Sequence, residues 1–123
     1  MEIKIFDNYD IQIVIQNEEP LFEIYTTGKA LGYSRWDGKT YDENGNEKLF
    51  TYKSRIDKII VNAEIEPIVI DGSKYFTESQ LYDFLLEART DSCKPFRRWV
   101  CDEVLPSIRK NKCYITESAT QEE

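Results

Sequence analysis

Period-two alternation at the start of the chain is the feature that most constrains its fold. Apolar residues occupy every second position of 2–6 and of 11–16, and turn-forming residues follow at 7–8 and 17–20. A third apolar run, 21–25, comes directly after the second turn. Because strand side chains alternate between two faces, this pattern predicts an antiparallel meander of three short strands with one buried face. The residues expected on that face of the second strand are Ile11, Ile13 and Ile15.

A second hairpin and a capped helix are predicted further along the chain. The apolar run 67–70 and the segment 73–76 flank Asp71-Gly72, a pair typical of tight two-residue hairpin turns. Thr77 and Gln80 then have the spacing of a capping box. The helix that this box opens has apolar residues at helical spacing, namely Leu81, Phe84, Leu85 and Ala88.

Two shorter helices are predicted between these hairpins. Thr26 or Thr27 can cap a short helix over 28–31, and Ser54 can cap a helix over 55–62. The stretch between them is polar, and Asn44-Gly45 in it is typical of a two-residue hairpin turn. We therefore interpret 35–53 as an exposed hairpin or loop inserted between two helices.

The last predicted helix contains two prolines with different consequences. Pro95 suits the first turn, where a missing N–H costs nothing. Pro106 removes a helical hydrogen bond, so a kink or a fresh short helix is expected there. The apolar stripe of this helix comprises Phe96, Trp99, Val100, Val104 and Ile108.

Together these elements predict an α+β fold, a small antiparallel sheet of short strands and hairpins packed with three to four helices. The chain has 123 residues, which fits one domain, expected over 1–114. Residues 115–123 are polar and acidic and are predicted to form a disordered tail. Neither a signal-peptide pattern nor a long apolar run is present, so a soluble intracellular protein without membrane contact is expected.

The absence of histidine limits the kinds of catalytic and metal-binding site that the chain can form. It excludes Ser-His-Asp and Cys-His nucleophile pairs, His-ligated metal sites and imidazole bases. Cys93, Cys101 and Cys113 lack the short spacing of zinc sites, so we interpret them as reduced thiols, with a redox-active thiol as the alternative. No phosphate-binding glycine motif is present. We therefore expect a binding protein with no catalytic residues, no metal and no cofactor.

The net charge of -7 conceals an asymmetry. Residues 89–112 contain seven basic and three acidic residues, a net +4, which leaves -11 for the rest of the chain. The candidate contacts to phosphates or to an acidic partner are Lys94, Arg97, Arg98, Arg109 and Lys110. The alternative is a solvated helix face on which Arg98 pairs with Asp102 at i, i+4.

A second cluster interleaves aromatic and basic residues in the first half of the chain. Its members are Tyr25, Tyr33, Trp36 and Tyr41 with Lys29, Arg35 and Lys39. Such side chains can stack on bases or on a protein partner. Partial core packing beneath a loop is the alternative interpretation.

Three stretches of the chain resemble the N-terminal domain of the BRO family, found in phage antirepressors and baculovirus repeated-ORF proteins. The first is PLF at 20–22 running into KALGYS at 29–34, and the second is YFTESQLY at 75–82. The third and most specific is KPFRRWV at 94–100 with EVLPSIRK at 103–110. With the segments between them, the resemblance covers roughly residues 1–114.

The resemblance implies a small α+β domain of phage and prophage regulators that act on the lysis–lysogeny switch, in the cytoplasm of a bacterial host. In the family, the helix ending in ALGYS is closely followed by a second helix, an arrangement like a helix-turn-helix. Here the candidate second helix, 55–62, follows the 35–53 insertion and offers Arg55 and Lys58 as cations. A helix-turn-helix needs a short turn, so the insertion argues against direct DNA reading.

Two functional hypotheses follow, and a third class, an enzyme, has little support. The leading one is an antirepressor-like protein that binds a transcriptional repressor, with the acidic part of the chain mimicking DNA phosphates. The alternative is a DNA-binding regulator that uses the basic C-terminal helix together with the helix-turn-helix-like pair. Homo-oligomerisation stays open, as does whether the chain is a stand-alone protein or a domain of a longer one. The contact residues expected besides the basic helix are Lys29, Arg35, Arg55 and Lys58.

Overall fold

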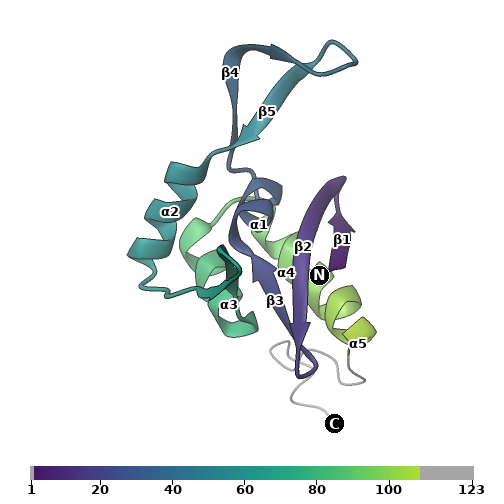
Figure 1. The fold of residues 1–123 in the computed structure, drawn as a ribbon, viewed down its shortest axis with the longest axis vertical. Coiled ribbons are helices and arrows are strands. Elements are labelled where there is room, and N and C mark those ends of the chain that lie inside the picture. The colour runs from purple at the N-terminus through teal and green to yellow at the C-terminus, as the bar shows by residue number, and fades with distance from the viewer. Residues whose placement is uncertain (1, 109–123) are drawn as a thin grey trace.

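The computed structural model describes residues 2–108, which form an α+β fold of two antiparallel sheets and a set of short helices (Figure 1). The predicted fold class is therefore confirmed. The strands are β1 (Glu2–Phe6), β2 (Tyr9–Gln16), β3 (Glu19–Glu23), β4 (Ser34–Tyr41), β5 (Glu47–Thr51), β6 (Ile68–Ile70) and β7 (Ser73–Phe76). The helices are α1 (Ile24–Ala30), α2 (Lys53–Asn62), α3 (Glu78–Ala88), α4 (Cys93–Trp99), the π-helix η1 (Val100–Val104) and α5 (Leu105–Ile108).

The main sheet has the strand order β1-β2-β3-β7-β6, and all its neighbours are antiparallel. The predicted meander and the hairpin around Asp71-Gly72 are both confirmed. The predicted buried side of the first strand was wrong: Ile3 and Ile5 are 57% and 65% exposed, because Phe6 on the opposite side packs against Phe96 of α4. The smaller sheet consists of β4 and β5 alone. Expectations for Arg109, Lys110 and the 115–123 tail lie outside the described residues. Within 2–108, no helix is long and apolar enough to cross a membrane.

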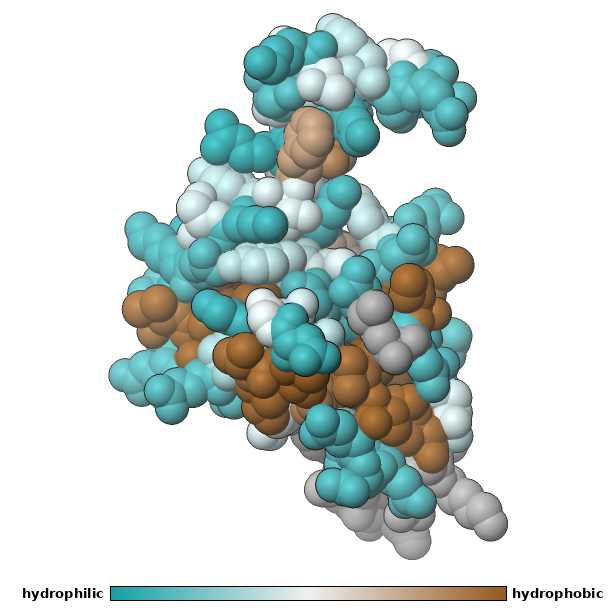
Figure 2. Space-filling model, viewed as in Figure 1, coloured by the Kyte–Doolittle hydropathy of each residue, from teal (hydrophilic) through white to brown (hydrophobic). Residues whose placement is uncertain are grey.

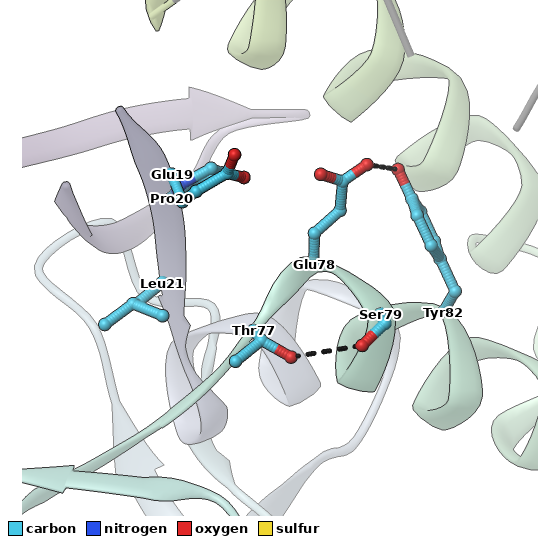
Figure 3. A pocket seen from close by; sticks show the side chains of 7 residues that line it. All are labelled: Glu19, Pro20, Leu21, Thr77, Glu78, Ser79 and Tyr82. Atoms are coloured by element: carbon cyan, nitrogen blue, oxygen red, sulfur yellow. Dashed lines mark hydrogen bonds between the residues drawn. The ribbon is translucent and has the colours of Figure 1, made fainter. Parts of the chain in front are cut away.

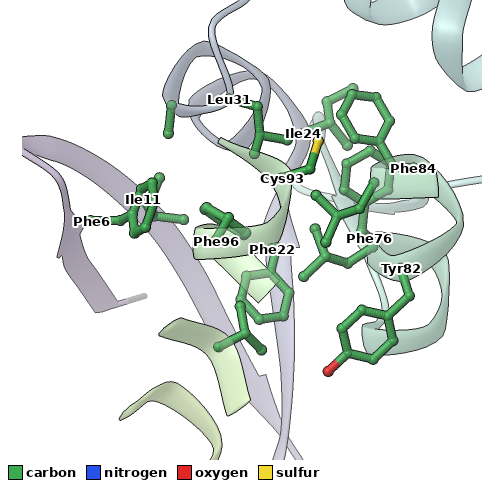
Figure 4. Close-up of a cluster of buried hydrophobic side chains, with 14 of the residues drawn as sticks. Phe6, Ile11, Phe22, Ile24, Leu31, Phe76, Tyr82, Phe84, Cys93 and Phe96 are labelled. Atoms are coloured by element: carbon green, nitrogen blue, oxygen red, sulfur yellow. The ribbon is translucent and has the colours of Figure 1, made fainter. Parts of the chain in front are cut away.

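The hydrophobic core lies between the main sheet and the helices packed on it (Figure 4). Its largest fully buried side chains are four phenylalanines, Phe22, Phe76, Phe84 and Phe96. Ile11 and Ile13 are completely buried, as the alternation predicts. Ile15 was also predicted to be buried but is 36% exposed, because it pairs with Pro20 next to the turn that ends β2.

The predicted starts of the first two helices were wrong. α1 begins at Ile24, and its cap is Glu23, whose carboxylate accepts hydrogen bonds from the N–H groups of Tyr25 and Thr26. The chain therefore turns from β3 into α1 without a loop, and neither threonine caps. α2 begins at Lys53 without a side-chain cap, because backbone pairing at the hairpin base already sets its start.

The remaining helix boundaries follow the sequence closely. Thr77 and Gln80 exchange the two hydrogen bonds of a capping box at the start of α3. α4 contains Pro95 in its first turn, and a short helix, α5, begins one residue before Pro106. Between them η1 adopts π geometry, an irregularity that often accompanies a disrupted helical hydrogen-bond ladder.

Candidate interaction surface

The β4–β5 hairpin projects away from the rest of the molecule (Figure 1). None of residues 34–51 is buried. The two strands pair in regular register from Ser34 opposite Thr51 to Trp36 opposite Leu49, and an irregularity follows before Tyr41. The hairpin therefore displays its side chains to solvent and contributes nothing to the core.

Local contacts order this hairpin. The Trp36 and Tyr41 rings lie 5.6 Å apart, and the Trp36 indole N–H donates to the Thr40 carbonyl. The Asp37 carboxylate accepts hydrogen bonds from the Thr40 hydroxyl and from backbone N–H groups, and these lower its pKa. The predicted two-residue turn at Asn44-Gly45 was wrong. Residues 42–46 form the connection because the Asp42 carboxylate accepts from two backbone N–H groups within it.

The base of the hairpin closes so tightly that the helices on either side remain neighbours. The N–H of Tyr52 donates to the Tyr33 carbonyl at 2.9 Å. α1 and α2 then pack so closely that a Cβ added to Gly28 would lie 2.6 Å from Ile56 Cγ1. From the sequence, the insertion argues against direct DNA reading because it replaces the short turn of a helix-turn-helix. In the structure it extends outward as a hairpin, so α1 and α2 remain in contact.

Basic side chains occur on each of the three elements that meet at the hairpin base, namely α1, β4 and α2. This surface, termed the basic junction, comprises Lys29, Arg35, Lys53, Arg55 and Lys58. Lys53 lies 5.1 Å from the centre of the Tyr25 ring, and Arg35 lies 5.0 Å from that of Tyr52. No ion pair within residues 2–108 involves any of the five cations. Their charges are therefore available to an anionic ligand.

Two tyrosines support the basic junction. The Tyr25 hydroxyl donates a 2.8 Å hydrogen bond to Asp57, and burial together with this bond raises the pKa of Tyr25 to about 12. Asp57 is the single acidic residue of α2, and its carboxylate accepts this hydrogen bond. The Tyr33 hydroxyl donates to the Ala88 carbonyl, joining the hairpin base to the end of α3, and burial raises its pKa while nearby Arg55 opposes the rise.

The predicted site residues fall into two groups that the structure does not bring together. Lys94, Arg97 and Arg98 lie on α4, whereas four others, Lys29, Arg35, Arg55 and Lys58, belong to the basic junction. α3 packs against both α2 and α4 and lies between them (Figure 1). The remaining two predicted residues, Arg109 and Lys110, lie outside the described range.

On α4, the alternative interpretation included an ion pair between Arg98 and Asp102, and no such pair occurs within residues 2–108. Asp102 belongs to the π-helix, whose wider turn alters the i, i+4 geometry on which the pair depends. Both side chains instead line a shallow groove of about 440 Å³ between α4 and β1. The groove is lined by Phe6, Lys94, Pro95, Arg98, Trp99, Asp102 and Glu103.

Sequence reasoning missed two features of the surface. Lys53 was not predicted as a contact, although its place before the basic residues of 55–58 could have indicated it. The second feature is a hollow of about 310 Å³ between β3 and the start of α3 (Figure 3). Glu19 and Glu78 line it, and the Tyr82 hydroxyl donates to the Glu78 carboxylate at 3.0 Å. Nothing in the sequence pattern joins these distant residues.

Comparison with known proteins identifies the family of the chain. The model of the BRO family N-terminal domain matches residues 10–106, which is most of the chain and includes α1, the hairpin, α2 and α4. No significant match was found among curated proteins or among solved structures. The family is associated with phage antirepressors and regulators and with DNA binding. The chain belongs to the BRO family and carries its N-terminal domain.

Proposed function

We propose that this BRO-family domain is a transcription regulator of phage or prophage that binds DNA through the α1–α2 pair and the basic junction. The observation that carries the proposal is the direct packing of Gly28 in α1 against Ile56 in α2, with the hairpin extended outward. Contact between two successive helices is what a helix-turn-helix arrangement requires.

The second helix of the pair has the chemistry that groove binding requires. Lys53, Ser54 and Arg55 are exposed at the start of α2, and Lys58 is exposed one turn later. In helix-turn-helix proteins the first residues of the second helix contact base edges, and cations around it contact phosphates. Arg35 at the hairpin base adds a cation beside the helix. We propose that the domain acts by binding rather than catalysis, because the chain has no histidine and no nucleotide motif.

The test compares charge reversals on the two basic surfaces. The variant Arg55→Glu/Lys58→Glu changes the basic junction, and Lys94→Glu/Arg98→Glu makes the same change of charge on α4. Binding to a duplex selected from a random pool is measured by fluorescence anisotropy at several salt concentrations. We expect the first variant to lose affinity by more than ten-fold and to lower the salt slope by about two, since each phosphate contact contributes about one.

The proposal is wrong if both variants weaken binding equally, or if no duplex binds at about 50 mM salt, where phosphate contacts are strongest. Circular dichroism establishes that each variant is folded before binding is measured.

One observation favours a second function, the antirepressor role that the sequence favours most. The far end of the hairpin carries three carboxylates, Asp42, Glu43 and Glu47, which would be repelled by DNA. Tyr41 and Leu49 are 57% and 42% exposed in the same hairpin. An acidic surface with apolar side chains fits a basic protein such as the DNA-binding face of a repressor. The variant Tyr41→Ser/Leu49→Ser should then weaken binding to a purified phage repressor, while DNA affinity stays unchanged.

A further inference from the structure

The outer edge of β1 has the features of a strand that pairs with another strand. β1 is an end strand of the main sheet, so within residues 2–108 one side of its backbone has no partner. Ile3 and Ile5 are 57% and 65% exposed. Figure 2 shows apolar side chains at the surface on the side where β1 and β2 lie. An exposed apolar end strand is a template for pairing with another chain.

The opposite edge of the sheet differs from this one. β6 spans only Ile68–Ile70 and follows Pro67, and short end strands preceded by proline resist pairing. β1 is longer, contains no proline, and pairs with β2 in continuous register from Glu2 opposite Ile13 to Phe6 opposite Tyr9. The β6 edge is therefore protected against pairing with another strand. The β1 edge lacks such protection, apart from the charge of Lys4.

We propose that β1 pairs antiparallel with β1 of a second copy, forming a two-fold symmetric dimer with one continuous sheet. The charge pattern of the strand selects the register. With Ile3 opposite Ile3 of the second copy, Glu2 lies opposite Lys4 of that copy, and symmetry repeats the pair. Centring on Lys4 would oppose two lysines, and centring on Glu2 would oppose two glutamates. Centring on Ile5 would set Lys4 opposite Phe6 and would match no opposite charges. The register centred on Ile3 therefore matches both an apolar residue and the two charged residues.

The face on which each residue lies is consistent with this register. Phe6 is buried against Phe96 and Trp99 of α4, so alternation places Glu2 and Lys4 on the helix-bearing face. Ile3 lies on the opposite face, where its counterpart in the second copy would cover it. Lys4 Nζ already lies 3.6 Å from Glu2 Oε1 of its own strand, so the two opposite charges lie close together on this face.

The dimer has a consequence for DNA binding that rests on the proposed function. Two copies related by a two-fold axis present two basic junctions, which suits two half-sites of a palindromic sequence. The dimer itself is measured without DNA, so the failure of one proposal is distinguishable from the failure of the other.

The experiment is a charge swap followed by sedimentation velocity over a range of protein concentrations. We expect the full chain to dimerise reversibly, and Lys4→Glu to raise the dimer dissociation constant about ten-fold or more, because two ion pairs become two like-charge contacts. Glu2→Lys, which changes a well-exposed side chain, should act in the same way. The double variant Glu2→Lys/Lys4→Glu restores both ion pairs with the charges exchanged. Its dimer dissociation constant should return to within about two-fold of that of the original chain.

The matched control is Lys74→Glu, which makes the same change of charge on an exposed residue of β7. It should leave the dissociation constant unchanged. A chain that stays monomeric at every concentration would overturn the proposal. So would equal effects of Lys4→Glu and Lys74→Glu, or a double variant that fails to recover the dimer.

Discussion

The hairpin and the rest of the described domain, its body, are ordered by different forces. In the body, Phe22 and Phe76 are completely buried between sheet and helices, whereas no residue of 34–51 is buried in the hairpin. Hydrophobic burial stabilises the body, while the hairpin depends on strand pairing, ring contacts and two aspartate-centred turns. The body therefore determines whether the domain folds, and the hairpin can specialise in contacts without endangering the fold.

The same substitution in the two regions should give the largest contrast. Phe76→Ala removes a fully buried ring that lies 4.8 Å from Phe84, and we expect a loss of about 3–5 kcal/mol in the free energy of unfolding. Phe50→Ala removes a ring that is 39% exposed in the hairpin and should cost less than about 1 kcal/mol. Urea denaturation followed by circular dichroism measures both. Similar losses would contradict the division into body and hairpin.

The contact that joins the two helices predicts an intermediate effect. Gly28→Ala places a methyl group against Ile56, a fully buried side chain that cannot easily move. We expect a net loss of about 1–2 kcal/mol, since overpacking exceeds the gain in helix propensity. Ile56→Val removes the methyl nearest to the new Cβ, so Gly28→Ala should cost less in that background. A double-mutant cycle measures the coupling, and strict additivity would show that the two residues do not press on each other.

Removing the hairpin should affect the body still less. Ser34 and Thr51 face each other across the base, so an Asn-Gly turn can replace 35–50. We expect the free energy of unfolding to change by less than about 1 kcal/mol, because no buried side chain is lost and the closed loop becomes shorter. Urea denaturation of the shortened chain, compared with the full chain, is the measurement. Cooperative unfolding near the original midpoint would support the comparison, and failure to fold would refute it.

The sequence predicted the body well because its signals there are local and redundant. The Asp71-Gly72 turn and the capping box at Thr77 each involve neighbouring residues, and each was found in the structure. Alternation predicted the strands and the buried side of β2, but it predicted the wrong buried side for β1, where Ile3 and Ile5 are exposed. Helix starts were predicted less well. Glu23 caps α1 only because the chain enters the helix directly from β3, a fact of tertiary structure that a preference for threonine caps does not reveal.

The candidate site was predicted in its parts but not in its assembly. From the sequence, the 35–53 insertion argues against direct DNA reading by Arg55 and Lys58 because the short turn is missing, yet α2 still packs on α1. The decisive contact, Gly28 with Ile56, spans an insertion, and no local pattern shows that the ends of an insertion meet. For the same reason, charge counting grouped the basic residues of α4 with those of the basic junction, whereas α3 separates the two groups in space.

The smallest predicted effect tests how the hairpin is held. Hydrogen bonds from the Thr40 hydroxyl and from the backbone N–H of Lys39 lower the pKa of Asp37 below its ordinary value of 3.8. When folding lowers the pKa of a carboxyl group, that group stabilises the folded state at pH values above its pKa in the unfolded chain. This stabilisation is lost as the pH falls through its pKa in the folded chain. Acidification below 3.8 should therefore loosen the turn. Asp37→Asn should loosen it at neutral pH and remove this pH dependence.

Trp36 lies in this hairpin, so its fluorescence in a Trp99→Phe background reports the change without a signal from α4. The matched control is Glu43→Gln, which neutralises an exposed carboxylate in the same hairpin and should leave the Trp36 signal and its acid response unchanged. Because Asp37 is fully exposed, solvent screens the interaction, and the shift in fluorescence should be small compared with that caused by removing the Trp36–Tyr41 contact in Tyr41→Ala. An equal response of Asp37→Asn and Glu43→Gln would mean that strand pairing alone holds the hairpin. The hairpin would then differ from the body in how exposed its side chains are, and not in the type of interaction that holds it.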